Sequence, residues 1–254
     1  MSAVAESGHL GGASLTLALL LAGYLVLGQP VVGAYNEERF QRAVGRDPGA
    51  RLARYRRSAL TEWALVAVSV WLVAASPGLD LADVGVRWPR LSGGAAPYTV
   101  VGGLGLILSG LLLAGLRRRV DRGRELRATA GVAALLPRTA AERRAFTAVA
   151  LTAGICEETL YRGVLLGITS SLLPGLSPGR LALVSALAFG LAHTYQGVAG
   201  MLSTAILGGC LAVLYLGSGS LLLPILYHVL VDLRVLVLAV GRRGQGRHAA
   251  SRTS

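Results

Sequence analysis

Two adjacent glutamates, Glu157 and Glu158, stand inside an apolar segment and are followed by Arg162. On a helix, Glu158 and Arg162 are four residues apart and can pair on one face, while Glu157 is rotated about 100° away from Glu158. One carboxylate can therefore be neutralised by the arginine while its neighbour stays available. A buried carboxylate of this kind can transfer protons, either in an enzyme or in the relay of a transporter.

Two histidines lie in later apolar segments. His193 follows Phe189 by four residues, and His228 and Asp232 are again spaced to share one face of a helix. A charged residue inside a membrane helix costs about 2.5–3.5 kcal/mol on insertion scales, so such residues are rare and need partners. We therefore expect three helices to bring Glu157 and the two imidazoles to similar depths in one polar cluster.

The elements that position this cluster are apolar and long. The chain has 254 residues, of which 53% are hydrophobic and only 15% charged. A helix needs about 20 apolar residues to cross a bilayer, and seven runs approach that length: residues 14–35, 59–79, 97–116, 146–172, 180–195, 198–217 and 219–240. The sequence predicts an all-α fold, a polytopic membrane helical bundle of about seven transmembrane helices.

The basic residues are all arginines, and most of them cluster in alternate connections between the apolar runs. Cytoplasmic loops carry such an excess, so we expect seven crossings of the cell (plasma) membrane with the N-terminus outside and the C-terminus cytoplasmic. The net charge of +12 does not indicate nucleic-acid binding, because no basic stripe alternates with aromatic residues as in a nucleic-acid reader. The lipid bilayer is the expected partner.

Three ordered motifs carry a resemblance to a known family. Residues 157–162 match the pattern EExxxR, residues 189–193 match FxxxH, and residues 228–232 match Hxxx(N/D). In order and spacing they resemble the CAAX-prenyl-protease and bacteriocin-processing (CPBP) family of intramembrane proteases. The resemblance covers about residues 142–240. It implies a peptidase that hydrolyses a peptide bond of a membrane-associated or lipid-modified peptide, although it does not imply that the substrate is prenylated.

The resemblance also implies roles for the motif residues. Glu157 would be the general base that activates water, and His193 would help to hold and polarise that water. His228 and Asp232 would stabilise the oxyanion of the tetrahedral intermediate. Asp232 departs from the asparagine of the eukaryotic members. Because an ionised carboxylate cannot donate a hydrogen bond, Asp232 must be protonated or must instead orient His228.

The other motif residues, Glu158, Arg162 and Phe189, are expected to support the site structurally. The family has been described both as metalloproteases and as metal-free glutamate proteases. Zinc needs about three protein ligands, which Glu157, His193 and His228 could supply. We favour a site that requires no cofactor, with zinc as the alternative, because the sequence has no HExxH helix or comparably close ligand pair.

The apolar runs in the first half of the chain contain fewer ionisable residues than those in the second half. Its apolar runs contain one interior ionisable residue, Glu62, which we place near a helix start, where a carboxylate suits the helix dipole. We therefore expect residues 1–141 to be transmembrane scaffold with Arg-rich cytoplasmic loops, residues 142–240 to form the catalytic helical domain, and residues 241–254 to be a basic cytoplasmic tail.

Two other functions stay open. A proton-coupled transporter also uses glutamates and histidines in membrane helices, but the first half has no matching polar residues and no inverted repeat is evident. A non-enzymatic membrane partner or immunity protein could keep the fold and its polar cluster. The complete set of motif residues favours the enzyme.

Overall fold

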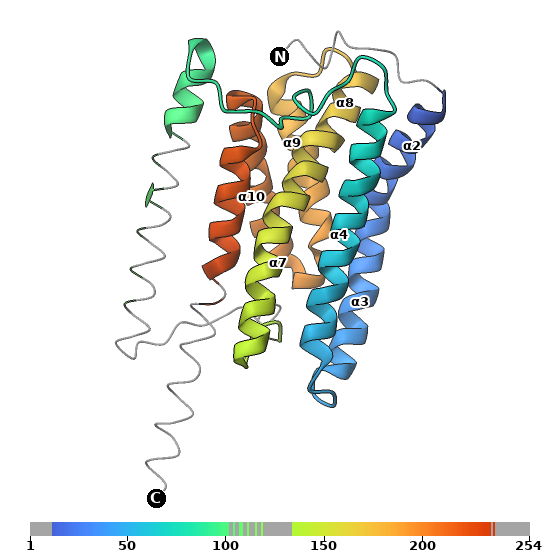
Figure 1. Cartoon of the computed structure of the whole chain (residues 1–254), viewed down its shortest axis with the longest axis vertical. Coiled ribbons are helices and arrows are strands. Elements are labelled where there is room, and N and C mark those ends of the chain that lie inside the picture. The colour runs from blue at the N-terminus through green and yellow to red at the C-terminus, as the bar shows by residue number, and fades with distance from the viewer. Residues whose placement is uncertain are drawn as a thin grey trace, which may run out of the picture.

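The computed structural model describes residues 12–101 and 134–234 continuously, and also residues 104, 107, 108, 111, 115, 118 and 236. Across these residues the chain is helical and contains no strand, which confirms the all-α prediction. The helices stand side by side as a bundle (Figure 1). The predicted tail, residues 241–254, and most of the Arg-rich stretch between Arg117 and Arg144 lie outside the described residues.

The N-terminal part is one long helical segment followed by a second helix. α2 (Gly12–Gly23), a π-helical turn η1 (Tyr24–Gly28) and α3 (Gln29–Ala43) are continuous, and α4 (Ala50–Ala74) follows. α4 packs beside α7 (Ala140–Glu158) (Figure 1). Trp63 of α4 donates its indole N–H to Thr152 Oγ1 of α7 at 3.2 Å, so the two helices are also joined by a hydrogen bond.

The second part begins at a well-capped helix. The side chain of Thr139 accepts from the backbone N–H of Glu142, whose own side chain accepts from the backbone of Thr139, which completes a capping box. α7 then passes through the π-helix η3 (Thr159–Leu165) into α8 (Leu166–Leu172). α9 (Pro178–Ala192) starts with Ser177 as N-cap, since the Ser177 hydroxyl accepts from the backbone of Arg180.

The last helices complete the bundle. A 3-10 turn η4 (Thr194–Gln196) leads into α10 (Gly197–Ser218), which packs along α9. α10 ends at Ser218 and is followed by Gly219, whose φ of 68° is left-handed, a conformation that a glycine adopts without steric cost. Residues 222–234 are helical again. A second 3-10 turn, η2 (Gly93–Ala95), precedes the helical residues 96–101.

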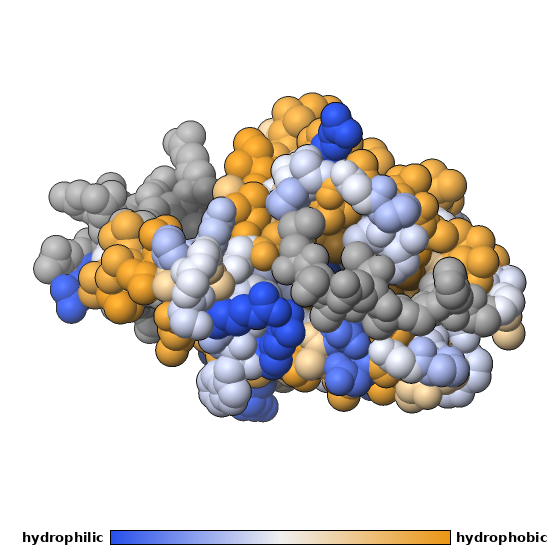
Figure 2. Space-filling view, turned by 90° about the horizontal axis from the view of Figure 1, so that it is seen from above, coloured by the Kyte–Doolittle hydropathy of each residue, from blue (hydrophilic) through white to orange (hydrophobic). Residues whose placement is uncertain are grey.

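Several helices have the composition of membrane spans. Within the described residues, three helical segments are long and apolar enough to cross a membrane, Gly12–Ala43, Ala50–Ala74 and Thr194–Ser218, and Pro178–Ala192 is a shorter apolar helix. Large apolar side chains such as Leu27, Leu60 and Ile206 are about 70% exposed, at 70%, 72% and 71%. Apolar residues cover much of the described rim in the view from above (Figure 2). The count of about seven crossings stays a prediction, because runs 97–116 and 219–240 lie partly outside the described residues.

α7 lies in close contact with the helix formed by residues 222–234. A Cβ added at Gly154 would lie 2.4 Å from Val229 Cγ2 and 3.2 Å from the Val229 backbone nitrogen. Only a glycine therefore allows this approach, as small residues do between membrane helices generally. Glu157 and Glu158 stand one turn after Gly154, and His228 directly precedes Val229. The contact thus sets the two motifs opposite each other.

Candidate active site

Glu157 lies between the two motif histidines. Its Oε2 is 3.8 Å from His193 Nε2 and 3.8 Å from His228 Nε2. All three residues are buried, each with an exposed fraction of 9% or less. Glu157 Oε2 is also a buried atom without a hydrogen-bond partner among the described residues. The predicted convergence of one carboxylate and two imidazoles is therefore confirmed.

The ring of His193 is oriented by the end of its own helix. α9 ends at Ala192, so the carbonyl of Phe189 is one of the last four that lack a regular helical partner. His193 Nδ1 lies 2.8 Å from that oxygen. A carbonyl oxygen only accepts, so Nδ1 must carry the proton, and in the neutral ring Nε2 then presents a lone pair toward Glu157.

Two acceptors therefore face each other across 3.8 Å. The Glu157 carboxylate and the lone pair of His193 Nε2 cannot hydrogen-bond each other directly, and the distance is longer than a hydrogen bond. A water molecule has two O–H groups, so it can donate one to each acceptor. The arrangement is suited to binding a water whose oxygen is left facing the cavity.

Glu158 has a different environment from its neighbour. Its Oε1 accepts from Arg162 Nη1 at 2.8 Å and from His228 Nδ1 at 2.7 Å. Glu158 and Arg162 have no exposed surface. The predicted pairing of these two residues is confirmed, and Glu158 additionally fixes the ring of His228, so that His228 Nε2 points to Glu157.

Arg162 connects the site to a second helix. Its Nη2 donates to the carbonyl of Gly208 on α10 at 3.0 Å. A Cβ at Gly208 would lie 3.1 Å from Arg162 Nη2 and 3.0 Å from Phe189 Cδ1, so the small residue leaves room for the guanidinium. The guanidinium carbon lies 4.3 Å from the ring centroid of Phe189, in cation–π geometry.

The ring of Phe189 packs against three other aromatic rings around the site. Its ring is 5.2 Å from that of Tyr161, 4.6 Å from His193 and 5.7 Å from His228, measured between centroids. Phe189 therefore packs against the Arg162 guanidinium and against both imidazole rings. Tyr161 also donates to the carbonyl of Leu25 in η1 at 3.3 Å, which joins the first helical segment to η3.

Asp232 is at the rim of the site. Its Oδ2 lies 3.8 Å from His228 Nε2, and its side chain is 31% exposed. The His228 nitrogen that an orienting carboxylate would bind is Nδ1, and Glu158 already occupies it. Asp232 therefore shares with Glu157 the nitrogen that faces the cavity.

A cavity of about 280 Å³ opens onto these groups. The motif residues that line it are Glu157, Phe189, His193, His228 and Asp232, and the other lining residues with polar groups include Arg54, Tyr55, Ser58, Glu62, Tyr195 and Gln196. α4 thus supplies one wall of the cavity, and the 3-10 turn after α9 supplies another part.

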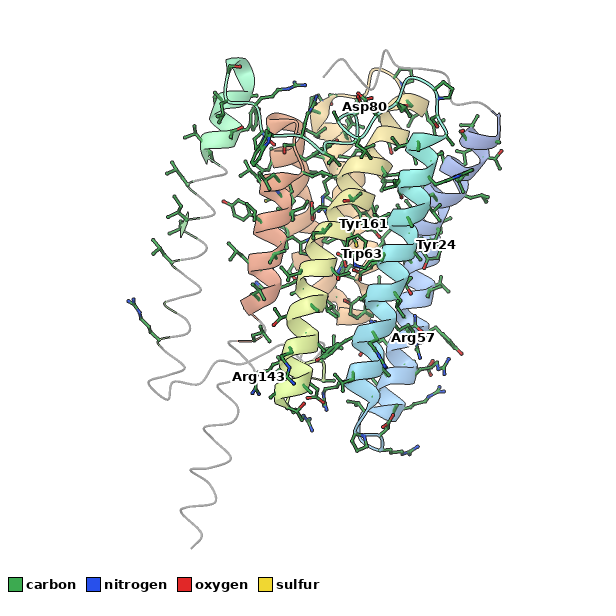
Figure 3. The ribbon with its side chains drawn as sticks, in the orientation of Figure 1. Tyr24, Arg57, Trp63, Asp80, Arg143 and Tyr161 are labelled. Carbon is green, nitrogen blue, oxygen red and sulfur yellow. The ribbon has the colours of Figure 1, made fainter. Side chains whose placement is uncertain are left out.

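The expectation that Glu62 lies near the start of its helix is wrong. α4 begins at Ala50, twelve residues earlier, because the apolar run that was used to locate the helix begins only after its arginines. Glu62 is 6% exposed and lines the cavity. The next residue, Trp63, is at mid-height of the bundle near the level of Tyr161, whereas Arg57 and Arg143 lie toward one end and Asp80 at the other (Figure 3).

A zinc site needs about three protein ligands arranged around one point. In the part of the chain that the structure describes, no three His, Cys, Asp or Glu side chains are arranged to hold a metal ion. Glu158 engages His228 Nδ1, and the Phe189 carbonyl engages His193 Nδ1, so both Nε2 atoms are left facing Glu157. The mechanism below uses these side chains alone.

Comparison with known proteins agrees with the motifs. Residues 141–234 match a family model described as Type II CAAX prenyl endopeptidase Rce1-like. The match covers all three motifs and confirms the resemblance to the CPBP family. Neither the curated proteins nor the solved structures gave a match. Together with the long apolar helices, the matched region identifies a membrane protein that is similar over residues 141–234 to CAAX-type endopeptidases.

Proposed function

We propose that this chain is an intramembrane endopeptidase that hydrolyses a peptide bond by attack of a water held between Glu157 and His193. The observation that carries the proposal is the pair of acceptors, Glu157 Oε2 and His193 Nε2, which lie 3.8 Å apart and line the cavity. Glu157 accepts a proton from the water while His193, with Nδ1–H held by the Phe189 carbonyl, accepts the second O–H and orients it.

His228 and Asp232 stabilise the oxyanion of the tetrahedral intermediate. His228 is held through Nδ1 by Glu158, so its Nε2 faces the cavity. When this nitrogen carries a proton it donates to the oxygen of the tetrahedral intermediate, and a protonated Asp232 adds a second donor at the rim. Glu158 and Arg162 keep the ring in place without contacting the substrate.

The substrate is a membrane-associated or lipid-modified peptide. The family model that matches residues 141–234 describes CAAX prenyl endopeptidases, so a farnesylated CAAX peptide is the first probe to use. The cavity lies within a bundle whose outer side chains are apolar, which suits a substrate that reaches the site from the bilayer. No cofactor is required in this mechanism.

The experiment compares membrane peptides from cells that contain the wild-type protein or Glu157→Gln. The wild type should produce cleaved ends that the variant lacks. Identical peptides in both would contradict the peptidase function and favour a transporter or a non-enzymatic partner.

The metal content of the purified protein tests whether the mechanism needs zinc. Active protein should contain no stoichiometric zinc and should resist chelators, whereas one bound zinc that is lost in His193→Ala would contradict the metal-free mechanism.

A further inference from the structure

Glu62 is a buried carboxylate that none of the three motifs contains. It lies outside the matched residues 141–234 and is 6% exposed in the middle of α4. Ser58 Oγ donates to its Oε1 at 3.1 Å, and its Oε2 is buried without a hydrogen-bond partner among the described residues. Glu62 lines the same cavity as Glu157, so this side chain borders the site.

The cavity therefore has two carboxylates with an unpartnered oxygen each, Glu62 and Glu157. The guanidinium of Arg162 is bound to Glu158. Two carboxylates that face one cavity repel each other when both are ionised, and such a pair can hold one proton between its members. The other charged side chains that line this cavity are Arg54, Asp232 and Arg234. A smaller cavity of about 80 Å³ is also lined by both residues, so Glu62 and Glu157 border two common spaces.

We propose that Glu62 is the general acid of the site: it holds this shared proton on Oε2 and delivers it to the amine that leaves when the peptide bond breaks. The inference rests on the proposed function. Glu157 has the position of the base because the water lies between it and His193. Glu62 stands on α4, a different wall of the cavity, and Ser58 engages its other oxygen.

The protons and bonds balance through one cycle. The water oxygen bonds to the carbonyl carbon as Glu157 takes a water proton. The C–N bond then breaks, its electron pair stays on nitrogen, and the proton of Glu62 moves to that nitrogen. Glu157 is now protonated and Glu62 ionised. A proton passes from Glu157 to Glu62 through cavity water, which restores the starting state, and the products are an acid and an amine.

The first test detects the proton itself. Infrared spectra of the purified full chain at neutral pH should show the carbonyl stretch of protonated carboxyl groups, and Glu62→Gln should remove the part of this absorption that belongs to Glu62, while the part that belongs to Asp232 remains. Glu37→Gln is the matched control: Glu37 is 9% exposed, accepts one hydrogen bond from Gln41 Nε2, has an unpartnered Oε2 and lies outside the residues that line the cavity. The control should keep the band. An absorption that is unchanged in Glu62→Gln would overturn the proposal.

The second test separates acid catalysis from a structural role. It uses a farnesylated CAAX peptide and a thioester analogue whose scissile N–H is replaced by sulfur, since a thiolate leaves without being protonated. Glu62→Gln should lower kcat for the amide by about 100-fold or more, and lower that for the thioester by less than about tenfold. Glu37→Gln should leave both rates unchanged.

The outcomes distinguish the two proposals. Equal losses on amide and thioester, or an unchanged amide rate, would overturn the acid role while the peptidase function stands. A wild type that cleaves neither probe would count against the peptidase function, and the infrared band then still decides whether Glu62 holds the proton. Glu62→Asp, which keeps an acid, should retain the band and part of the amide activity even if Glu62→Gln folds poorly.

Discussion

Glu158→Gln should destabilise the protein far more than the same change at its neighbour. Glu158 and Arg162 have no exposed surface, and Glu158 Oε1 accepts from both Arg162 and His228. Removing one partner of a buried ion pair leaves the other charge uncompensated and costs about 3–5 kcal/mol. For a chain of this size the melting temperature falls by about 2–4 °C per kcal/mol, so we expect a loss of about 6–20 °C.

The assay is thermal unfolding of the purified protein in detergent, followed by circular dichroism. Glu157→Gln is the matched control, because Glu157 Oε2 lies 3.8 Å from the Nε2 atom of each histidine, which is beyond hydrogen-bond distance. This variant should melt close to the wild type but be inactive. Glu158→Leu combined with Arg162→Met should recover most of the stability, since an apolar pair can replace a buried ion pair. It should stay inactive because His228 loses its Nδ1 acceptor.

Two results would refute this reasoning. A wild-type melting temperature for Glu158→Gln would mean that the ion pair does not stabilise the fold. Equal losses in Glu157→Gln and Glu158→Gln would mean that the two glutamates do not have separate roles.

Three further predictions concern mechanism and topology. Glu157→Ala, His193→Ala and the double variant should have similar residual activities, because groups that act on one step are non-additive; multiplied losses in the double variant would contradict a shared water. Asp232→Asn should keep part of the activity in a peptide-cleavage assay, whereas Asp232→Ala should lose about 2.7–4 kcal/mol of transition-state stabilisation; an inactive Asp232→Asn would show that the amide cannot replace the acid. A reporter fused at Gly123 should be cytoplasmic and one at Ser92 exported, and an exported Gly123 fusion would overturn the predicted orientation.

The parts of the site that were predictable are those that depend on local geometry or on depth. The Glu158–Arg162 pair follows from helical spacing, which is nearly independent of the rest of the fold. The meeting of Glu157 with His193 and His228 follows from placing their helices across one bilayer, because groups at similar depth in a small bundle can approach each other.

The parts that were not predictable depend on helix ends and on packing. The hydrogen bond from His228 to Glu158 requires the close approach at Gly154, which no single-helix pattern indicates. The orientation of His193 depends on α9 ending at Ala192, three residues before the end of the apolar run. Glu62 was visible as a charged residue in an apolar run, but its helix begins earlier, among arginines, and only packing shows that it faces the cavity.

The central claim is that a water held by Glu157 and His193 hydrolyses a peptide bond. The most direct measurement is mass spectrometry of a farnesylated CAAX peptide incubated with the purified protein in ¹⁸O-labelled water. The wild type should release a product with one ¹⁸O atom in its new carboxyl group, and Glu157→Gln, at equal folded concentration, should release none. Product formation at the same rate by both proteins, or no product from the wild type, would contradict the account.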